Sequence, residues 1–458
     1  MSNSGLAAHP VSSTSSGIGE IVALAELICN AVTDLRDEYA VQSMPSLKST
    51  DTWPFDAPET RPAKVSKAVR TIEAACAQLS FTVANPGHVF VNKCYGFQEP
   101  TCMLVAADAK IADHLLDKPE GVHVDELAGK TGIDSQKLAH VLRFLATKHC
   151  FTEVKPNIFA NNRISLKLIS TDPLSSFLGH VADEGMKGCC LLNENLSDPQ
   201  TTSSVDPNGS AFKRAHGCSL FDYLSGPGQE ERSARFARAM VGWGEVTGKA
   251  MLPKVYPWAS LPAGTVICDV GGGNGHATVE LLKAFPLLKF VVQDLPGVID
   301  QGKKFIRAEI TDPNLRKRVE YVPLNFFEGI PVQECDFYYV RHVLHDWPDP
   351  ACQQILGSIR KAMKPSSRLL INEFVLQSLV RDSAYDQILD RAPEPLLPNY
   401  GMGNIRAYAQ DITMMAFLNS KERTLQEFID LGVRSGFKFV KLWDESEVGL
   451  LEFEIMPV

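Results

Sequence analysis

The sequence has no uninterrupted apolar run that approaches the ~20 residues needed for a membrane-spanning helix. Its first residues, MSNSGLAAHPVSSTSSG, also lack the charged and then apolar segments of a secretory signal peptide. We therefore expect a cytoplasmic protein that has no membrane partner.

Cysteine pairs at metal-ligand spacing and an excess of basic residues are missing as well. The eleven cysteines are scattered without a C-x-x-C pair, and only Cys189 and Cys190 are adjacent, which favours neither a disulfide framework nor a zinc site. The 45 basic residues are outnumbered by 54 acidic ones, giving a net charge of −9. Broad binding to nucleic acid or to an anionic membrane needs a basic face and is not expected.

The composition is that of a globular protein, with 45% hydrophobic and 22% charged residues, and 458 residues suffice for two to three domains. Helical periodicity predicts helices over 21–39 and 63–83. Beyond residue 265 strands and helices alternate, which favours a parallel, doubly wound sheet. The expected segments are a disordered tail (1–18), N-terminal helices with a Pro-rich linker (19–98), a winged-helix domain (99–170), and a helical connector followed by the catalytic domain (171–458).

The winged-helix segment is predicted from a succession of three helices and a hairpin. The helices are expected over 104–116, from residue 124, and after the cap at Asp134, and the hairpin strands over 151–154 and 158–160. Winged helices commonly bind DNA, so a non-catalytic regulator is the alternative hypothesis. The third helix offers only a thin polar and basic face, made of Gln136, Lys137, His140, Arg143 and Lys148.

The most informative stretch is TVICDVGGGNGHATVELLKAFPLLKFVVQDLP, which begins at Thr265. It predicts a strand, a glycine loop, a helix from His276 to Phe285, and a second strand that ends at Asp294. Glycines at a strand's carboxyl end let the backbone approach a ligand closely, and an acid after the next strand can bind a ribose diol. A tight turn without a ligand is the alternative interpretation.

The glycine spacing distinguishes between nucleotide ligands. A dinucleotide fingerprint requires a third glycine or alanine where this chain has His276, which disfavours an NAD-dependent oxidoreductase. The pattern Asp269-x-Gly271-x-Gly273-x-Gly275 instead resembles the first motif of class I S-adenosylmethionine (SAM) methyltransferases. That resemblance implies SAM as co-substrate, held by Gly271, Gly272, Gly273 and Asp294.

A second informative stretch, DFYYVRHVLHDW, begins at Asp336 and ends a buried strand in polar residues. Ligands bind at the carboxyl edge of an open α/β sheet, so Arg341 and His345 should lie at the same edge as Gly271 and Asp294. The pair His342-x-x-His345 lacks the acid-rich or cysteine-rich partners of a metal site, so no metal is expected and His342 is interpreted as structural.

Four motifs in order resemble the small-molecule O-methyltransferases related to plant caffeic acid O-methyltransferase. They are Asp294-Leu295-Pro296, His345-Asp346-Trp347, the strand Leu370-Ile371-Asn372-Glu373, and Lys421-Glu422-Arg423-Thr424. The resemblance covers about residues 99–458 and implies a Rossmann-like SAM methyltransferase domain with an N-terminal helical, winged-helix dimerisation domain. It implies a homodimer that binds a small aromatic phenol.

Two departures from the plant pattern concern the cofactor. Asn325 stands where an acid often binds the adenine amino group, and Arg341 stands where a Lys is usual. Phe326 beside Asn325 is interpreted either as an adenine platform or as a core residue. An amide oxygen still accepts a hydrogen bond and Arg remains a cation, so SAM binding should survive. The changes suggest a fungal-type branch that acts on aromatic polyketides such as anthraquinones, xanthones or sterigmatocystin-type compounds.

The candidate catalytic residues also make chemical sense on their own. A phenol with a pKa near ~10 is mostly protonated at neutral pH, so methyl transfer needs a base. His345, with an ordinary pKa of about 6.5, can take that proton, while Glu373 and Glu422 orient the imidazole and stabilise its cation. The segments that contain Met240, Trp243, Met414, Met415 and Phe417 are candidates to line an apolar acceptor pocket, with plain core packing as the alternative interpretation.

Overall fold

The computed structural model describes residues 17–42, 48, 50, 63–248, 251–381, 388–443 and 447–457. The predicted disordered tail lies outside the described residues except for Gly17 and Ile18, which begin helix α1 (Gly17–Gln42). Most of the predicted Pro-rich linker also lies outside them. In the described part of the chain, every helix is too short or too polar to cross a membrane.

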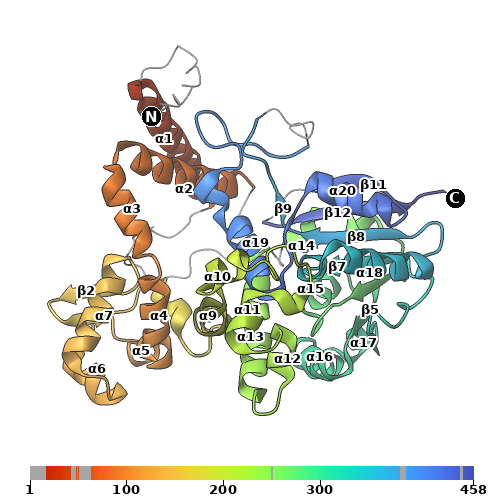
Figure 1. The fold of residues 1–458 in the computed structure, drawn as a ribbon, viewed down its shortest axis with the longest axis horizontal. Helices are drawn as coiled ribbons and strands as arrows, with labels where there is room; N and C mark the ends of the chain where they lie inside the picture. The colour runs from red at the N-terminus through yellow and green to blue at the C-terminus, as the bar shows by residue number, and fades with distance from the viewer. Residues whose placement is uncertain are drawn as a thin grey trace.

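Three helices precede the winged-helix unit: α1, α2 (Ala63–Val83) and α3 (Pro86–Cys94). Helices α1 and α2 pack together and lie against the C-terminal part of the chain (Figure 1), where Leu24 and Ala75 share a buried cluster with Tyr400. The sequence predicted α2 correctly but did not predict α3, which begins at a proline and is capped by the Asn85 side chain.

The winged-helix unit contains the expected helices and hairpin. Its elements are α4 (Gln98–Asp108), α5 (Ile111–His114), β1 (Val122–His123), α6 (Val124–Thr131), α7 (Ser135–Thr147), β2 (Thr152–Lys155) and β3 (Ile158–Ala160). The single helix predicted over 104–116 is wrong. The chain breaks there because Lys110 adopts a left-handed conformation, with φ of 52°, between α4 and α5. No glycine or proline marks this break in the sequence.

The connector after residue 170 is mainly helical, as predicted. Its helix α8 packs along α13, where the rings of Phe177 and Trp243 stack with centroids 5.1 Å apart. The elements of this region are η2 (Ser165–Leu168), α8 (Pro173–Gly179), the π-helix η3 (His180–Gly185), α9 (Met186–Cys189), α10 (Leu192–Ser197), η4 (Pro207–Gly209), α11 (Ala211–His216), α12 (Leu220–Ser225), α13 (Glu230–Val246), α14 (Leu252–Val255) and η6 (Trp258–Ser260).

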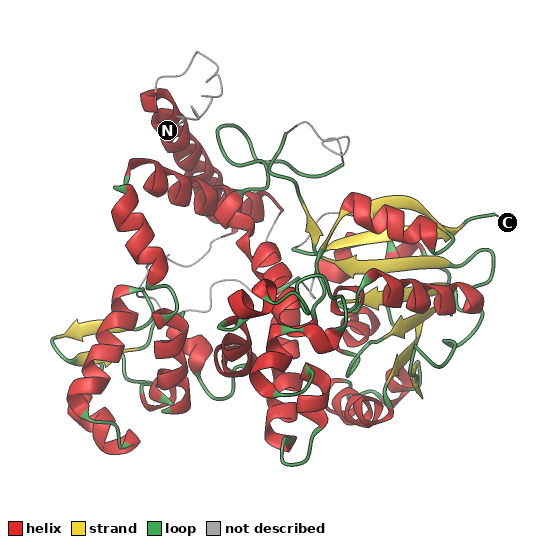
Figure 2. Ribbon diagram, in the orientation of Figure 1, coloured by secondary structure: helices red, strands yellow, loops and turns green. Residues whose placement is uncertain are grey.

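A seven-stranded sheet in the order β11-β12-β8-β7-β4-β5-β6 forms the C-terminal domain. Its strands are β4 (Val266–Val270), β5 (Lys289–Asp294), β6 (Val319–Pro323), β7 (Phe337–Arg341), β8 (Arg368–Glu373), β11 (Phe437–Trp443) and β12 (Gly449–Ile455). Figure 2 shows this sheet and the small winged-helix sheet at opposite ends of the molecule, with helices between them. The prediction of a parallel sheet holds for β4 to β8. It fails for β12, which is antiparallel to β8 and β11, because too few residues separate β11 from β12 for a parallel crossover.

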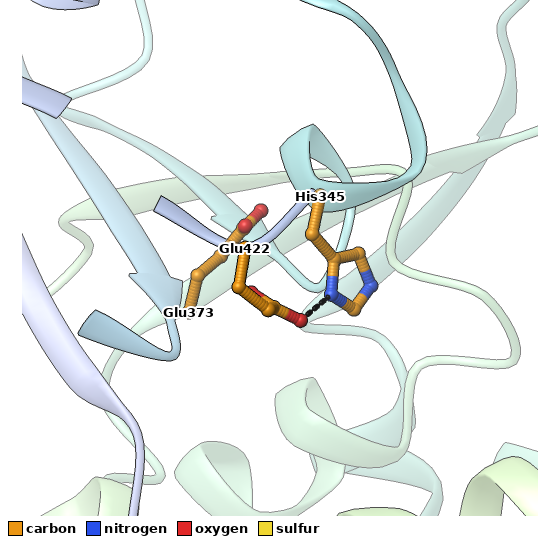
Figure 3. A group of neighbouring side chains, drawn as sticks. All are labelled: His345, Glu373 and Glu422. Carbon is orange, nitrogen blue, oxygen red and sulfur yellow. Dashed lines mark hydrogen bonds and ion pairs between the residues drawn. The ribbon is translucent and has the colours of Figure 1, made fainter. Parts of the chain in front are cut away.

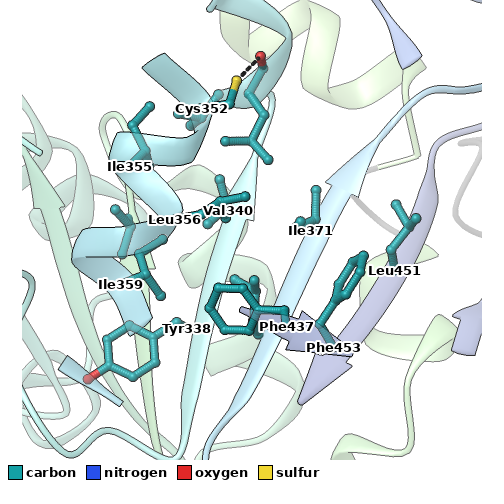
Figure 4. Close-up of a cluster of buried hydrophobic side chains, with 14 of the residues drawn as sticks. Tyr338, Val340, Cys352, Ile355, Leu356, Ile359, Ile371, Phe437, Leu451 and Phe453 are labelled. Carbon is teal, nitrogen blue, oxygen red and sulfur yellow. Dashed lines mark hydrogen bonds between the residues drawn. The ribbon is translucent and has the colours of Figure 1, made fainter. Parts of the chain in front are cut away.

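Helices cover both faces of this sheet. Alternate strand residues face opposite sides, so Tyr338 and Val340 pack against α18, whereas Tyr339 joins a second cluster with Trp258. Figure 4 shows the first cluster, in which Ile355 lies on the buried side of α18. The remaining elements are α15 (His276–Ala284), α16 (Pro296–Glu309), α17 (Pro313–Arg316), η7 (Leu344–Asp346), α18 (Asp349–Ala362), β9 (Val375–Leu376), η8 (Gly401–Asn404), α19 (Ile405–Leu418), β10 (Arg423–Thr424) and α20 (Leu425–Arg434).

Candidate active site

The glycine loop leaves β4 with backbone angles that favour glycine. Gly271, Gly273 and Gly275 have φ of 73°, 59° and 83°. A Cβ atom on Gly271 would lie 2.7 Å from Cγ2 of Val343, and one on Gly272 would lie 2.6 Å from the Asp269 carboxyl carbon. The same construction at Gly273 meets no atom within 4 Å. The loop is therefore packed tightly on its protein side and open at Gly273.

Asp294 lies directly beside that open position. Its Oδ2 accepts a hydrogen bond from the Gly273 amide at 2.9 Å, and its Oδ1 accepts one from the Leu295 amide at 2.7 Å. Burial raises the pKa of this carboxyl. Each carboxylate oxygen has a second lone pair, so both can also accept from a ribose diol. The residues present thus fit a nucleoside at the end of β5.

Asn325 and Phe326 follow β6 at the same edge of the sheet. The Asn325 Oδ1 accepts a hydrogen bond from the Phe327 amide at 3.1 Å, so one lone pair of the predicted adenine acceptor is already used. The Phe326 ring lies 3.8 Å from the Cβ position of Gly271 and edge-on to Trp347. The Phe326 ring therefore lies next to the glycine loop.

Arg341 is buried at the end of β7, and its contacts tie neighbouring elements together. It donates through Nη1 to Oδ1 of Asn372 at 2.9 Å and through Nη2 to the Thr247 hydroxyl at 3.2 Å. Its Nε has no partner among the described residues. These hydrogen bonds connect β7 to β8 and to the end of α13, which supports a structural role for Arg341. The Arg341 Nε is the atom that remains for the predicted contact with the cofactor.

His345 forms a buried pair with Glu422 (Figure 3). Its Nδ1 lies 2.6 Å from Oε1 of Glu422, and its Nε2, on the opposite side of the ring, lies 3.5 Å from Oδ1 of Asp346. Burial alone would lower the His345 pKa, but the charges of Glu422 and Asp346 and the Glu422 hydrogen bond outweigh it and raise the pKa to about 10. The folded-state pKa of His345 therefore departs from the ordinary histidine value.

Glu373 holds the loop of His345 rather than its ring. Its Oε1 accepts from the backbone amides of Val343 at 3.1 Å and Leu344 at 2.6 Å, and its Oε2 has no partner in the described part of the chain. Burial raises the pKa of this carboxyl to about 7. Of the two glutamates expected to orient the imidazole, Glu422 makes the direct bond and Glu373 acts through the backbone.

Arg423 binds the same loop through its backbone carbonyls, a role that the sequence analysis did not predict. Its guanidinium is fully buried and donates to the carbonyl oxygens of Leu344 at 2.8 Å and Trp347 at 2.9 Å, and to the carboxylate of Asp349. The turn that carries His345 is thus fixed through its amides by an acid and through its carbonyls by a cation. The basic residue in the Lys421–Thr424 motif was the available signal.

Comparison with known proteins places this site in a family. Residues 195–438 match the O-methyltransferase domain, and residues 91–171 match the O-methyltransferase dimerisation domain. The chain belongs to the O-methyltransferase family. It is 48% identical to "3-O-methyltransferase 2" of Phanerochaete chrysosporium over 435 residues, which cover 94% of this chain and 97% of that protein.

More distant relatives share this architecture. Sterigmatocystin 8-O-methyltransferase of Aspergillus flavus is 29% identical, over 81% of each chain. Among solved structures, mitomycin 7-O-methyltransferase superposes with a TM-score of 0.66 at 23% identity, covering 81% of this chain and 97% of that chain. The predicted α/β methyltransferase fold with an N-terminal helical dimerisation domain is confirmed.

The winged-helix unit of this O-methyltransferase is therefore a dimerisation domain, and its contacts disfavour the DNA-binding alternative. Two of the cations predicted on the face of α7 are engaged by acids: Arg143 lies 3.6 Å from Glu153, and Lys148 lies 3.4 Å from Glu99. Their charge is partly neutralised within the domain, which weakens a phosphate-binding role.

The predicted pocket residues of the O-methyltransferase fall into different environments. The Trp243 ring lies 6.0 Å from that of Phe374, which in turn lies 6.0 Å from His342, so Trp243 belongs to the aromatic groups near His345. Met414 and Phe417 instead pack in a core cluster of the helical region. Met240 and Met415 are half-buried.

His345, Glu373 and Glu422 also lie close enough to be considered as metal ligands. One ligand atom from each lies within 4.8 Å of the others, and all three residues are buried. The Nδ1 of His345 and Oε1 of Glu422 are committed to each other, and Oε1 of Glu373 accepts two backbone bonds. Three of the candidate ligand atoms are thus already hydrogen-bonded within the protein.

Proposed function

We propose that this O-methyltransferase transfers the methyl group of SAM to a phenolic hydroxyl and that His345 takes the phenolic proton. The supporting observation is the buried hydrogen bond between His345 and Glu422, at the same sheet edge as the loop formed by Gly273 and Asp294. Donor loop and base follow neighbouring parallel strands, β4 and β7. This is the placement that an in-line transfer between two bound molecules needs.

The residues proposed to hold the donor are the glycine loop and Asp294, with Asn325, Phe326 and Arg341 around the adenine. When bound, SAM supplies an electrophilic methyl group on a sulfonium cation. The positive charge of this sulfonium disfavours the protonated form of His345. Asp294 would bind the ribose through the lone pairs that its backbone bonds leave free. Phe326 would offer its ring to the adenine face.

The raised His345 pKa defines how the base works. At about 10 it matches an ordinary phenol, so proton transfer from the attacking oxygen to Nε2 is nearly balanced in free energy. Glu422 fixes Nδ1 as the protonated nitrogen and stabilises the imidazolium that forms. His345 must first lose the proton that it carries at neutral pH, so the active fraction rises with pH.

The acceptor is proposed to be a phenol on an aromatic, polyketide-type secondary metabolite. Trp243, Phe374 and His342 place flat rings near the base. A relative that aligns over 81% of the chain is named for sterigmatocystin, and another for transfer at a 3-hydroxyl. No metal is proposed to take part.

The direct test is methyl transfer by purified protein from labelled SAM to a panel of anthraquinone and xanthone phenols and single-ring phenols, with EDTA present. We expect O-methylated product from at least one phenol, retained in EDTA. Transfer to single-ring phenols alone would contradict the assignment of a polyketide-type acceptor. Activity lost in EDTA and restored by a divalent cation would contradict the metal-independent mechanism, and absence of transfer to any phenol would contradict the function.

The chain is further proposed to form a homodimer through its N-terminal region. Helix α3 has no buried residue, and large apolar side chains around it are exposed, including Phe90 at 69% and Phe97 at 61%. Exposed apolar groups gathered in this way mark an association surface, and they adjoin or lie within the segment that matches the dimerisation domain.

Light scattering should therefore report twice the chain mass for the wild type. Replacing both Phe90 and Phe97 by Glu should shift the mass to that of the single chain, because charges would be buried in the interface. Val205→Glu, at another exposed apolar position, is the matched control and should stay dimeric. A monomeric wild type would contradict the assignment.

Glu373 is proposed as a positioning residue. Glu373→Gln keeps an oxygen for the amides of Val343 and Leu344 but removes a charge near the base, so we expect about a tenfold loss of kcat with SAM affinity unchanged. Glu373→Met leaves both buried amides unsatisfied and should lose more and lower Tm. Steady-state kinetics and thermal melts measure this, with exposed Glu320→Gln as control. Wild-type kinetics in Glu373→Met would refute the role.

A further inference from the structure

His342 has a backbone conformation that few residues adopt. It follows β7 directly, with φ of 49°, and its amide bonds the Asn372 carbonyl at 3.3 Å. A left-handed φ is uncommon in residues other than glycine, and such strain persists where the surroundings fix it, often at functional sites. The conformation places the side chain at the sheet edge that carries His345.

The imidazole of His342 makes no hydrogen bond to the described part of the chain. Both ring nitrogens are buried, and neither has a hydrogen-bond partner among the described residues. Buried polar atoms are normally paired, and leaving two unpaired costs stability. A histidine kept only for packing would have at least one satisfied nitrogen, so the sequence-based interpretation of His342 as structural does not account for its contacts.

The neighbours of His342 keep it neutral. Burial lowers its pKa well below the ordinary value, and the positive charges of Arg341, His345 and His276 lower it further. A neutral imidazole offers one N–H donor and one acceptor nitrogen. Its ring is stacked beside that of His345, with centroids 5.2 Å apart and planes inclined by 29°.

This pairing of rings suits an acceptor that carries two neighbouring oxygens. His345 has its Nδ1 on Glu422, so its Nε2 remains for the hydroxyl that is methylated. If His342 also donated a hydrogen bond to this oxygen, that bond would occupy the lone pair that must attack the methyl group. The productive partner of His342 is therefore another oxygen of the acceptor, within reach of hydrogen bonds of about 2.8 Å from each ring.

We propose that His342 is a specificity-determining residue that hydrogen-bonds a second oxygen, ortho or peri to the hydroxyl being methylated. The preferred acceptors are then catechol-type or peri-oxygenated phenols. This inference rests on the proposed function and adds the substitution pattern of its substrate. An acceptor that lacks the second oxygen would leave the buried nitrogens of His342 unpaired. The preference for the doubly oxygenated acceptor should therefore be large.

The test compares matched acceptors in wild type and variants. Each pair differs by the neighbouring oxygen: catechol against phenol, and peri-dihydroxynaphthalene against the corresponding naphthol. The wild type should favour the doubly oxygenated member by about 10- to 100-fold in kcat/KM. His342→Phe keeps a flat ring without nitrogens and should bring this ratio close to one, while SAM affinity changes by less than about threefold.

A second variant distinguishes loss of the hydrogen bond from misfolding. His342→Asn suits a left-handed backbone and restores a donor and an acceptor, so it should recover part of the preference. His140→Phe, on the exposed side of α7, is the control and should keep the wild-type ratio. An unchanged ratio in His342→Phe, or an equal loss with both acceptors, would overturn the role of His342 alone. Failure of the wild type to methylate any phenol would overturn the proposed function and this inference with it.

Discussion

His345→Ala is expected to lose at least about a hundredfold in kcat at neutral pH, with SAM affinity nearly unchanged. Alanine removes the only proposed proton acceptor for the attacking oxygen and leaves Glu422 without its partner. Because Glu422 lies beyond that partner, its carboxylate does not replace the base. Rapid-quench methyl transfer and calorimetric SAM titration separate the two quantities.

The variant also has a diagnostic pH response. Transfer by His345→Ala should recover partly near pH ~10, where the phenol ionises without help. His140→Ala, an exposed histidine, controls for the loss of an imidazole and should behave as wild type. If His345→Ala turned over at the wild-type rate at neutral pH, the base would be a different group.

Asp294→Ala is expected to weaken SAM binding about a hundredfold, as the loss of two hydrogen bonds to a charged carboxylate predicts. The change should leave the fold intact, because among the described residues the side chain bonds only the amides of Gly273 and Leu295 at the sheet edge. Calorimetry on the purified variant gives the dissociation constant. Asp300→Ala, an exposed acid on α16, is the control. Wild-type affinity in Asp294→Ala would remove this loop from the donor site.

A glycine-loop variant tests the same site less cleanly. Gly271→Val would force a β-branched residue to φ of 73° and push its Cβ to 2.7 Å from Val343. We therefore expect Gly271→Val to lose stability as well as SAM binding, so a thermal melt must accompany the titration.

The residues singled out in the sequence gather at one sheet edge because their signals are local. The glycine spacing after β4, the acid after β5 and the histidine after β7 each sit at a strand end, and parallel strands bring such ends to one edge. The break at Lys110 could not be predicted, since its left-handed backbone occurs in a helical pattern without glycine or proline. The hairpin of β11 and β12 was missed because alternation alone does not give strand direction.

The electrostatics of the base could not be predicted either. Glu422, 77 residues beyond His345, sets the histidine pKa through a contact that only the folded chain makes. Glu373 was expected at the ring and instead accepts amides of the preceding turn. The motifs that contain Glu373 and Glu422 predicted that these residues lie near His345. They did not specify which atoms form the hydrogen bonds.

The most direct test of the mechanism is the pH dependence of kcat/KM in wild type and in Glu422→Gln. With a folded-state His345 pKa raised to about 10, the neutral base becomes more abundant as pH rises, so the wild-type rate should climb through pH ~7–9, reach half of its plateau near pH ~10 and level off above it. Without the Glu422 charge and hydrogen bond, only the Asp346 and Glu373 charges oppose the effect of burial on that pKa, so the pKa falls and the rising limb should move to lower pH with a reduced plateau. A limb at the same pH in both enzymes would contradict the assignment of His345, tuned by Glu422, as the base.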